Sequence, residues 1–379
     1  MAATTVIATS GICAPGRPKP GWIAIADGVI DDVGSGAPPA GAIDLGDALL
    51  VPGFIDLQIN GVDDCDFATG DAAAWRRAGG TLVQHGVTAC LPTLISAPLD
   101  RYDERLSAVT SWRDDAERTH LPTVLGVHLE GPFLGGAPGA HPVELLRPVS
   151  VEWLASTVAT HPGMIRLVTL APEADPDHAA IRALCRAGVV VAIGHSDATY
   201  DEARAAAGAG ATVVTHLFNG MGAMHHRAPG LAGAGLDDDR LTPTLIADLV
   251  HVHPAMVQLA IARKPNIALV SDAVATGNGV HADGSVARLP DGRIAGSRTL
   301  LDEAVANLVG LGVPIERAIE MATAVPAAVL GLSDRGRLEA GSSADLVALD
   351  PRTLAVRAVW LAGDLVVDAT SHPERRAGP

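Results

Sequence analysis

Four side chains that can bind a metal ion or move a proton stand at the carboxyl ends of apolar runs in this sequence. Glu130 ends one run, and His195 and His216 end two later ones. Asp272 ends a fourth. One carboxylate and two imidazoles leave the fourth position of a tetrahedral metal ion open for water, which is typical of a catalytic site. A zinc ion there lowers the pKa of its water to about 7, and Asp272 can accept the proton and pass it to a leaving nitrogen. The four residues therefore predict metal-assisted hydrolysis of an amide.

Each of these residues also has a structural interpretation. A lone histidine at the end of a strand more often forms a hydrogen bond in the core or in a loop than binds a metal ion. Four such residues at strand ends are much harder to explain by chance. His128 precedes Glu130 by two positions, so it points to the same side of the strand, and we assign it to packing or to the surroundings of the site.

The elements that must position these residues form a repeating pattern between residues 53 and 272. Eight apolar runs occur there, and segments with helical spacing separate most of them, such as Asp71 to Gln84, Asp177 to Arg186 and Asp201 to Ala207. Alternating strands and helices predict a (β/α)8 barrel of the TIM type, in which active sites lie at the carboxyl ends of the strands. The longer gaps after 219 and 272 predict loops over the site. The runs are 53–60, 87–95, 123–130, 165–171, 189–195, 211–218, 242–251 and 266–272.

Both ends of the chain have a different texture. Residues 1–50 consist of short alternating segments separated by glycine and proline, and the same texture returns in 344–350 and 356–368. We therefore predict a small β-sandwich domain built from residues 1–52 plus 337–379, with the barrel occupying residues 53–336.

Charge and composition exclude several classes of protein. The 379-residue chain has 27 Lys and Arg against 43 Asp and Glu, a net charge of −16. This field repels nucleic acid and anionic membranes, so we expect neither as a partner, and a phosphorylated substrate would need a local cluster of donors. Four scattered cysteines indicate reduced thiols. Without a signal-peptide pattern or a run of about 18 apolar residues, we expect a cytoplasmic protein.

Seven short motifs occur in order along the chain. They are Pro52-Gly-Phe-Ile-Asp56, Glu130-Gly-Pro132, Gly194-His-Ser196, Thr215-His-Leu-Phe-Asn219, Pro229-Gly-Leu-Ala-Gly233, Val270-Ser-Asp-Ala273 and Gly336-Arg-Leu-Glu-Ala-Gly341. Together they resemble the N-acetylglucosamine-6-phosphate deacetylase family of the amidohydrolase superfamily. The resemblance implies a deformed (β/α)8 barrel with a β-sandwich. It also implies an enzyme of amino-sugar metabolism that hydrolyses the acetamide of N-acetyl-D-glucosamine 6-phosphate to D-glucosamine 6-phosphate and acetate.

The resemblance implies roles for the residues at the site. The ligands of one divalent metal ion per subunit, most often Zn²⁺ with Fe²⁺, Co²⁺ or Mn²⁺ as alternatives, correspond to Glu130, His195 and His216. Asp272 corresponds to the catalytic acid and base. Many amidohydrolases help hold a second metal ion with His-x-His after the first strand, but this chain has Gln58-Ile-Asn60 there. Gln58 and Asn60 then either complete hydrogen bonds at the barrel mouth or contact a bound water.

The resemblance also implies how the substrate is held. His141 corresponds to a histidine that approaches the sugar and the amide carbonyl, where a donor stabilises the oxyanion. Phosphate contacts correspond to Asn219, Gly220 and His251. Arg227 corresponds to an arginine that reaches the site of the neighbouring subunit, which implies a homodimer. Since the run 242–251 predicts one strand, His251 and His253 should alternate along it, with only one of them facing the pocket.

Two segments depart from the family pattern. In the loop 133–141, Pro138 occupies a place where relatives usually carry a basic residue. After the first strand, Asp63, Asp64 and Cys65 stand where relatives often have glycine. These groups could bind a second metal ion, but we favour solvated surface acids.

Three alternative functions stay open at the level of sequence. The same chemistry could act on N-acetylgalactosamine 6-phosphate, because one epimeric hydroxyl is recognised by only a few contacts. An N-acyl or cyclic-amide amidohydrolase is a more distant alternative. A structural metal-binding barrel without turnover is the alternative outside enzymes, but such a site would not need the unligated acid Asp272.

Overall fold

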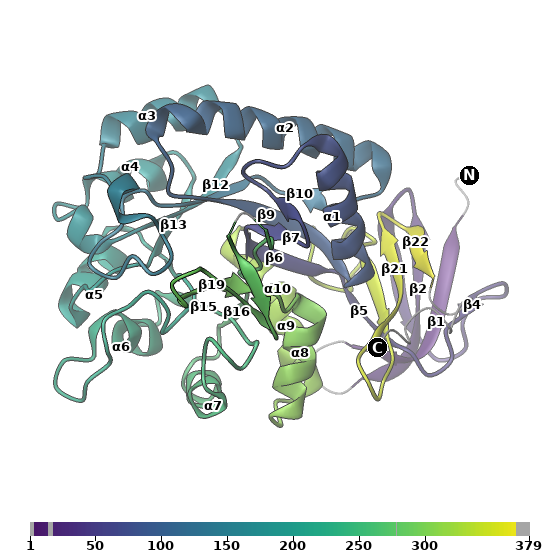
Figure 1. Cartoon of the computed structure of the whole chain (residues 1–379). Helices are drawn as coiled ribbons and strands as arrows, with labels where there is room; N and C mark the ends of the chain where they lie inside the picture. The colour runs from purple at the N-terminus through teal and green to yellow at the C-terminus, as the bar shows by residue number, and fades with distance from the viewer. Residues whose placement is uncertain (1–3, 14–17, 278, 369–379) are drawn as a thin grey trace.

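Eight parallel strands form a nearly closed barrel in the middle of the chain (Figure 1). The computed structural model describes residues 4–13, 18–277 and 279–368. Each of the eight apolar runs contains at least one barrel strand, and successive runs pair in parallel. The strands are β6 (Phe54–Ile59), β9 (Val87–Ile95), β11 (Val127–Glu130), β12 (Ile165–Leu170), β13 (Val190–Ile193), β14 (Val213–Val214), β15 (Thr242–Leu245) and β16 (Ala268–Leu269), with β10 (Thr123–Val124) also beside β9.

The barrel closes where its last strand meets its first. The Asp272 amide donates to the Gln58 carbonyl at 2.9 Å, and the Asn60 amide donates to the Ala273 carbonyl at 2.7 Å. Residues 214 positions apart in the sequence therefore become neighbours at the mouth of the barrel. The predicted (β/α)8 fold is confirmed.

Helices cover the outside of the barrel, as the helical spacing predicts (Figure 1). α1 begins after Asp71, whose carboxylate accepts a hydrogen bond from the Ala74 amide. α5 begins with a capping box between Thr199 and Glu202. No helix in the described part of the chain is both long and apolar enough to cross a membrane. The helices are α1 (Ala72–Gln84), α2 (Tyr102–Thr119), α3 (Val151–Thr160), α4 (Ala179–Arg186), α5 (Tyr200–Ala209), α6 (Gly230–Asp237), α7 (Pro254–Arg263), α8 (Leu301–Gly310), α9 (Ile315–Ala322) and α10 (Ala324–Val329), with single 3₁₀ turns at Leu99–Arg101, Val143–Leu145 and Pro172–Ala174.

The segment after Asp272 contains a small sheet where the sequence predicts only a loop. Its antiparallel strands are β17 (His281–Asp283), β18 (Val286–Arg288) and β19 (Ile294–Ser297), and we call residues 281–297 the flap. The Ser297 amide donates to the Asp272 carbonyl at 2.9 Å, so the flap is joined directly to the site. Strands of three or four residues between glycine-containing turns are too short to produce a clear alternating pattern. A second short hairpin, β7 (Gly61–Val62) and β8 (Cys65–Asp66), follows β6.

The prediction that His251 and His253 alternate along one strand is wrong. β15 ends at Leu245, and the Asp248 carboxylate accepts hydrogen bonds from the Val250 and His251 amides at 2.9 Å each. An aspartate that bonds the backbone two and three residues ahead forms a turn, so the apolar run does not stay extended. His253 instead caps α7, because its ring accepts a hydrogen bond from the amide two residues later.

Both ends of the chain form a small β-domain beside the barrel, drawn in purple and yellow at the right of Figure 1. Side chains of β1 to β3 pack against those of β5, β20 and β21 around one apolar core that includes Ile23, Leu50 and Trp360. The domain limits 1–52, 53–336 and 337–379 stay predictions, and residues 1–3, 14–17 and 369–379 lie outside the described residues. The strands are β1 (Thr5–Ile12), β2 (Lys19–Ala26), β3 (Val29–Ser35), β4 (Ile43–Asp44), β5 (Leu49–Pro52), β20 (Leu346–Leu349), β21 (Val356–Leu361) and β22 (Asp364–Asp368).

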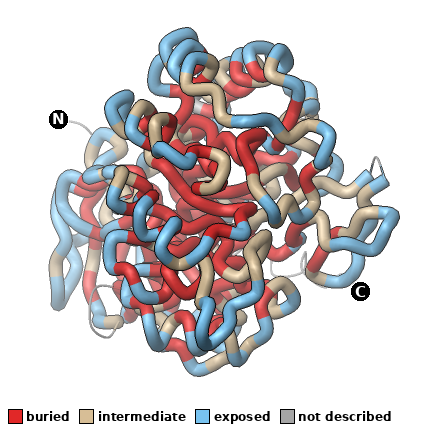
Figure 2. Tube along the Cα trace, turned by 90° about the vertical axis from the view of Figure 1, so that its left-hand side faces the viewer, coloured by how far each residue is buried: buried red, intermediate tan, exposed pale blue. Residues whose placement is uncertain are grey.

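Buried residues run through the middle of the molecule (Figure 2), and one of them is a carboxylate, Asp56. Asp56 on β6 is 0% exposed, and its Oδ1 accepts hydrogen bonds from the Gln58 and Ser271 amides at 3.2 Å each. Its Oδ2 has no hydrogen-bond partner among the described residues. Burial raises the pKa of Asp56 to about 6, although the bonds from Ser271 act in the opposite direction.

We expect the stability of Asp56→Asn relative to the wild type to increase as pH rises. The pKa of Asp56 is higher in the folded state, so the protonated carboxyl favours folding below about pH 4, and this contribution is lost as pH rises through about 6. Asparagine keeps an oxygen for the two amides and carries no charge. The difference in free energy of unfolding between variant and wild type should therefore grow by about 1.4 kcal/mol from pH 5 to pH 8. Urea unfolding at both pH values measures it, and a constant difference would contradict the raised pKa.

Candidate active site

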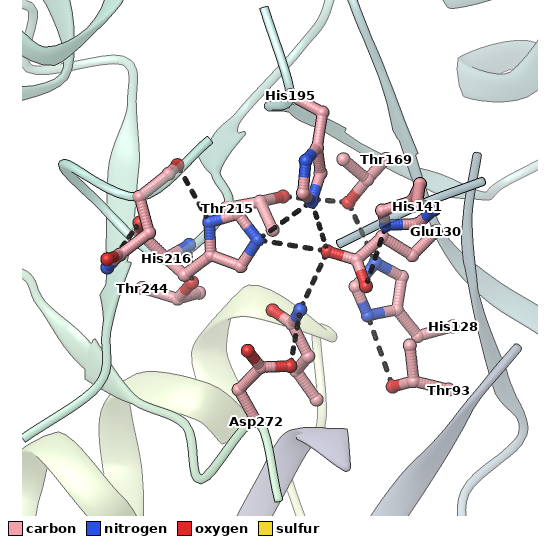
Figure 3. A network of polar contacts seen from close by, with 12 residues as sticks. Thr93, His128, Glu130, His141, Thr169, His195, Thr215, His216, Thr244 and Asp272 are labelled. Carbon is pink, nitrogen blue, oxygen red and sulfur yellow. Dashed lines mark hydrogen bonds and ion pairs between the residues drawn. The ribbon is translucent and has the colours of Figure 1, made fainter. Parts of the chain in front are cut away.

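The predicted metal ligands meet at the mouth of the barrel (Figure 3). Glu130 ends β11, while His195 and His216 follow β13 and β14. Glu130 Oε1 lies 3.0 Å from Nε2 of each histidine, and the two Nε2 atoms lie 3.0 Å apart. Within the described residues, these three form the one group of His, Cys, Asp and Glu side chains placed to hold a metal ion.

The chemistry of these ligand atoms fits a divalent cation. Nδ1 of His195 faces the Ala137 carbonyl at 3.3 Å, and Nδ1 of His216 faces the Asn219 carbonyl at 3.1 Å. A carbonyl only accepts, so each Nδ1 carries the hydrogen and each Nε2 presents a lone pair. Two lone pairs and a carboxylate oxygen repel one another unless a cation lies between them. Ligand atoms around a tetrahedral zinc ion lie about 3.3 Å apart, close to the separation found in this group.

Three residues of the site share an unusual backbone conformation. The φ angles of His195, His216 and Asp272 are 49°, 31° and 48°, in the left-handed region that residues other than glycine rarely adopt. Such conformations cost about 1–3 kcal/mol each and cluster at functional sites. Each one lies just after a barrel strand, where the chain turns and the side chain is directed into the barrel mouth. The direction of these three side chains is thus maintained at a cost in local stability.

Asp272 lies next to the metal ligands and is held by two amides. Asn60 Nδ2 donates to Asp272 Oδ1 at 2.9 Å, and Gln58 Nε2 lies 3.2 Å from the same oxygen and 2.8 Å from Glu130 Oε1. Both amides use Oδ1, so Oδ2 is the oxygen available to exchange a proton. Burial and the negative charge of Glu130 raise the pKa of Asp272 to about 7, near the pH at which a general base works best.

His141 lies beside the ligands, and Ser96 determines its orientation. His141 Nδ1 is 2.8 Å from the Ser96 hydroxyl and 3.4 Å from the Ser96 amide nitrogen, and its Nε2 is 3.8 Å from Glu130 Oε2. An amide N–H only donates, so Nδ1 accepts and the neutral ring carries its hydrogen on Nε2. Burial and the neighbouring His195 lower the pKa of His141 to about 3, which keeps the ring neutral. Sequence reasoning missed Ser96, although its place directly after β9 was an available signal.

A chain of hydroxyl groups supports the site from inside the barrel (Figure 3). His128 Nε2 lies 2.7 Å from the Thr169 hydroxyl, which lies 2.7 Å from the Thr215 hydroxyl. Burial lowers the pKa of His128 to about 4, so this ring is neutral. His128 therefore belongs to the surroundings of Glu130 and not to the group of metal ligands.

A pocket of about 410 Å³ opens above these residues. Gly220 lies against the His195 ring, where an added Cβ would come within 2.7 Å of Nδ1, so a larger residue would displace the ligand. Gln58 lies behind the pocket, in contact with Glu130 and Asp272. The predicted site residues that line the pocket are Asn60, Glu130, His141, His195, His216, Asn219, Gly220, His251 and Asp272.

Arg227, like Gln58, is a predicted site residue that does not line this pocket. It is exposed in the segment between Asn219 and α6, and its amide donates to His225 Nδ1 at 3.3 Å. Met224 nearby is 42% exposed. Within one copy of the chain, the guanidinium group is therefore on the surface.

Residues 135–140 of the loop lack a basic residue, but one reaches the loop from the flap. The Arg293 guanidinium, between β18 and β19, donates to the Gly139 carbonyl and pairs with Asp291 at 2.8 Å. On the other side of the loop, the Glu173 carboxylate accepts a hydrogen bond from the Gly136 amide at 3.1 Å. The loop that carries His141 is thus tied to two distant segments.

The extra acidic residues after β6 have partners other than a metal ion. Asp64 pairs with Arg77 at 3.0 Å, and Asp63 accepts a hydrogen bond from the Thr81 hydroxyl at 2.9 Å. Cys65 is buried, and burial raises the pKa of its thiol to about 12. These contacts favour ion pairing and packing over a second metal site.

A parallel barrel with a candidate metal centre and an unligated acid at its carboxyl end defines a class, the metal-dependent hydrolases of the TIM-barrel type. The model of the amidohydrolase family matches residues 49–370 of this chain. The chain therefore belongs to the amidohydrolase family.

Individual relatives are similar over nearly the whole chain. The N-acetylglucosamine-6-phosphate deacetylase of Bos taurus is 40% identical over 354 residues, which cover 85% of this chain and 84% of that protein. The N-acetylgalactosamine-6-phosphate deacetylase of Escherichia coli O157:H7 is 38% identical over 375 residues, which cover 91% and 96%. A variant of the Mycobacterium smegmatis N-acetyl-D-glucosamine-6-phosphate deacetylase, solved in complex with N-acetyl-D-glucosamine-6-phosphate, has a TM-score of 0.88 and 35% identity and covers 96% of this chain and 100% of that one.

Proposed function

We propose that this chain is a metal-dependent enzyme that hydrolyses the acetamide of N-acetyl-D-glucosamine 6-phosphate to D-glucosamine 6-phosphate and acetate. The observation that carries the proposal is the position of Asp272, an unligated acid beside a group of three metal ligands in one pocket. A structural metal site has no use for such an acid. The similarity to deacetylases of phosphorylated amino sugars, over most of the chain, supports this substrate class.

The residues of the site divide the work of amide hydrolysis. A divalent cation held by the three ligands would polarise the amide carbonyl and acidify a water molecule. Asp272 accepts the proton of the attacking water at Oδ2, because Gln58 and Asn60 occupy Oδ1. The same carboxyl returns the proton to the nitrogen as the C–N bond breaks, so the amine leaves as a neutral group. His141 donates its Nε2–H to the oxygen that becomes negative in the tetrahedral state.

The ligand set favours one divalent ion per subunit. Two imidazoles and one carboxylate suit Zn²⁺, and Fe²⁺, Co²⁺ or Mn²⁺ can occupy the same set. Gln58 and Asn60 argue against a second ion because side-chain amides are neutral and are already bonded to Asp272 and Glu130.

A local cluster of donors holds the phosphate in this proposal, because the net charge of −16 offers no general attraction. Asn219, Gly220 and His251 line one side of the pocket. Arg227 joins them from the neighbouring subunit of a homodimer, which accounts for its exposed position in a single chain. We place the enzyme in cytoplasmic amino-sugar recycling.

Acetate release from N-acetylglucosamine 6-phosphate by metal-loaded protein tests the proposed function. The unphosphorylated sugar and N-acetylgalactosamine 6-phosphate are assayed alongside. A strong preference for the 6-phosphorylated glucosamine derivative supports the proposal. Failure to hydrolyse either phosphorylated sugar would remove it and leave N-acyl and cyclic amides as the next substrates.

One alternative has an observation in its favour. The galactosamine-6-phosphate deacetylase of E. coli is nearly as similar to this chain as the bovine glucosamine enzyme. The assay of the two epimers decides between them, since they differ in one hydroxyl group. The N-acyl or cyclic-amide alternative predicts activity without phosphate, and a structural metal barrel predicts no turnover at all.

We expect Arg227→Ala to lower kcat/KM for the phosphorylated substrate by about 10- to 100-fold, because this is the loss in binding that removal of hydrogen bonds to a charged group usually causes.

If Arg227 acts in the neighbouring site, two chains with different defects should restore activity when they form one dimer. A heterodimer of Arg227→Ala with Asp272→Asn contains one site that has both Asp272 and the partner's arginine. Co-expression should then yield about a quarter of wild-type activity, since half of the dimers are mixed and each has one intact site. No recovery above the separate variants would contradict an arginine supplied across the interface.

A further inference from the structure

A buried aspartate is joined to a pocket histidine in the turn after β15. The Asp248 side chain is 0% exposed and that of His251 is 7% exposed. Asp248 Oδ2 lies 2.6 Å from His251 Nδ1, and Asp248 Oδ1 accepts hydrogen bonds from the Val250 and His251 amides at 2.9 Å each. Both carboxylate oxygens are thus used within four residues, and the ring cannot rotate without breaking the shortest of these bonds.

The charge of Asp248 determines which ring nitrogen meets a ligand. Burial raises the pKa of this carboxyl, but the bonds from the His251 ring and amide bring it below its ordinary value, so the group is an ionised acceptor. A carboxylate only accepts, so His251 Nδ1 carries a hydrogen. Nε2 is then the nitrogen left for a ligand, and His251 lines the same pocket as Asp272.

Contacts with the rest of the barrel hold the turn in place. The Asn307 side-chain amide on α8 donates to the Ala247 carbonyl at 2.9 Å. Leu249 has a φ of 64°, a conformation that the two backbone bonds to Asp248 maintain. The pair is therefore presented to the pocket by a turn with a defined conformation.

We infer that Asp248 is a positioning residue whose carboxylate holds the His251 ring by Nδ1 and so directs Nε2 at a phosphate oxygen of the substrate. This inference rests on the proposed function, because it assigns the phosphate as ligand. The 2.6 Å contact between Asp248 Oδ2 and His251 Nδ1 fixes the orientation of the ring, so Nε2 meets the ligand without a further loss of side-chain freedom.

The first test compares the preference for phosphorylated over unphosphorylated N-acetylglucosamine, as a ratio of kcat/KM values. In Asp248→Asn, one oxygen remains for the backbone amides, but the charge beside the ring is gone. We expect the ratio to fall about 10-fold through KM, with kcat changed less than about twofold. The matched control is Asp238→Asn, another buried aspartate, which pairs with Arg240 outside the pocket and should leave the ratio unchanged. Equal loss on both sugars would overturn the inference.

A double-mutant comparison tests whether Asp248 acts through His251. In a His251→Ala background, Asp248→Asn should cause no further fall in the ratio, because the residue that it positions is absent. Losses that multiply in the double variant would assign Asp248 a structural role and overturn the inference.

A measurement without turnover separates this inference from the proposed function. In ¹⁵N NMR spectra, the His251 ring, identified by its loss in His251→Ala, should show a protonated Nδ1 that changes in Asp248→Asn. Inorganic phosphate should shift its Nε2 signal in the wild type and much less in the variant. These results would support the Asp248–His251 role even if the acetamide substrate were wrong. An unprotonated Nδ1, or an Nε2 signal insensitive to phosphate, would overturn it.

Discussion

Replacing Asp272 by asparagine is expected to lower kcat for acetate release by about 10³-fold. The amide is nearly the same size and keeps an oxygen for the bonds from Gln58 and Asn60, but it cannot accept the proton of the attacking water. KM for the substrate should change little, because Asp272 is not among the residues proposed to hold the phosphate. Metal content should also stay near the wild-type value, since the ligand group does not include Asp272.

The control for this prediction is Asp63→Asn. Asp63 is also an aspartate after a barrel strand, but it is exposed and bonds the Thr81 hydroxyl, so its loss should leave kcat within about twofold. If Asp272→Asn retained more than about a tenth of the activity while binding metal normally, another group would have to move the proton. A parallel loss of metal would instead point to damage at the ligands.

Removing the charge of Glu130 should also abolish most of the activity, but through loss of the metal ion. Glu130→Gln keeps the shape of the side chain, but a neutral amide binds a divalent cation far more weakly than a carboxylate. Loss of groups that merely orient ligands weakens metal binding about 10- to 100-fold, so loss of this ligand should exceed 100-fold. We expect the purified variant to hold little metal and to have no measurable activity.

Metal removal from the wild type provides the matched comparison. Chelator treatment should abolish activity, and a divalent ion should restore it in the wild type but not in Glu130→Gln. At 100 times the dissociation constant, the ion should also stabilise the metal-free wild type by about 2.7 kcal/mol, seen as a rise in Tm that the variant lacks. Full activity after exhaustive chelation would rule out the proposed role of this ligand group.

The local pattern of the chain made most of the fold predictable. Continuous apolar runs, separated by segments with helical spacing, locate strands such as β9 and β12. A parallel strand that is buried on both faces needs such a run. Helical spacing in 71–84 and 201–207 predicted α1 and α5, and the structure shows that Asp71 and Thr199 cap the starts of these helices. The flap was missed since its strands are too short, and the length of β15 was overestimated because one aspartate side chain ends it.

The main residues of the candidate site were also predictable from their places at strand ends. A parallel barrel brings the carboxyl ends of all its strands to one face, so residues placed there must be neighbours. Glu130, His195, His216 and Asp272 could therefore be grouped before any coordinates were known. Ser96 stands directly after β9 and could have been added by the same rule, whereas the importance of Asp248 depends on the His251 ring that it touches. An aspartate in a turn does not distinguish itself in sequence.

The sequence by itself determined which residues stand at strand ends, what chemistry they can do and which family the chain resembles. Only the tertiary structure decided the contacts between segments of unrelated pattern. Arg293 meets Gly139 across 154 positions, and Gln58 meets Asp272 across 214. It also showed that His251 reaches the pocket from a turn and that Arg227 lies on the surface of a single chain. Strand and helix patterns arise from neighbours a few residues apart, whereas these contacts depend on how the whole barrel closes and where its loops fold back.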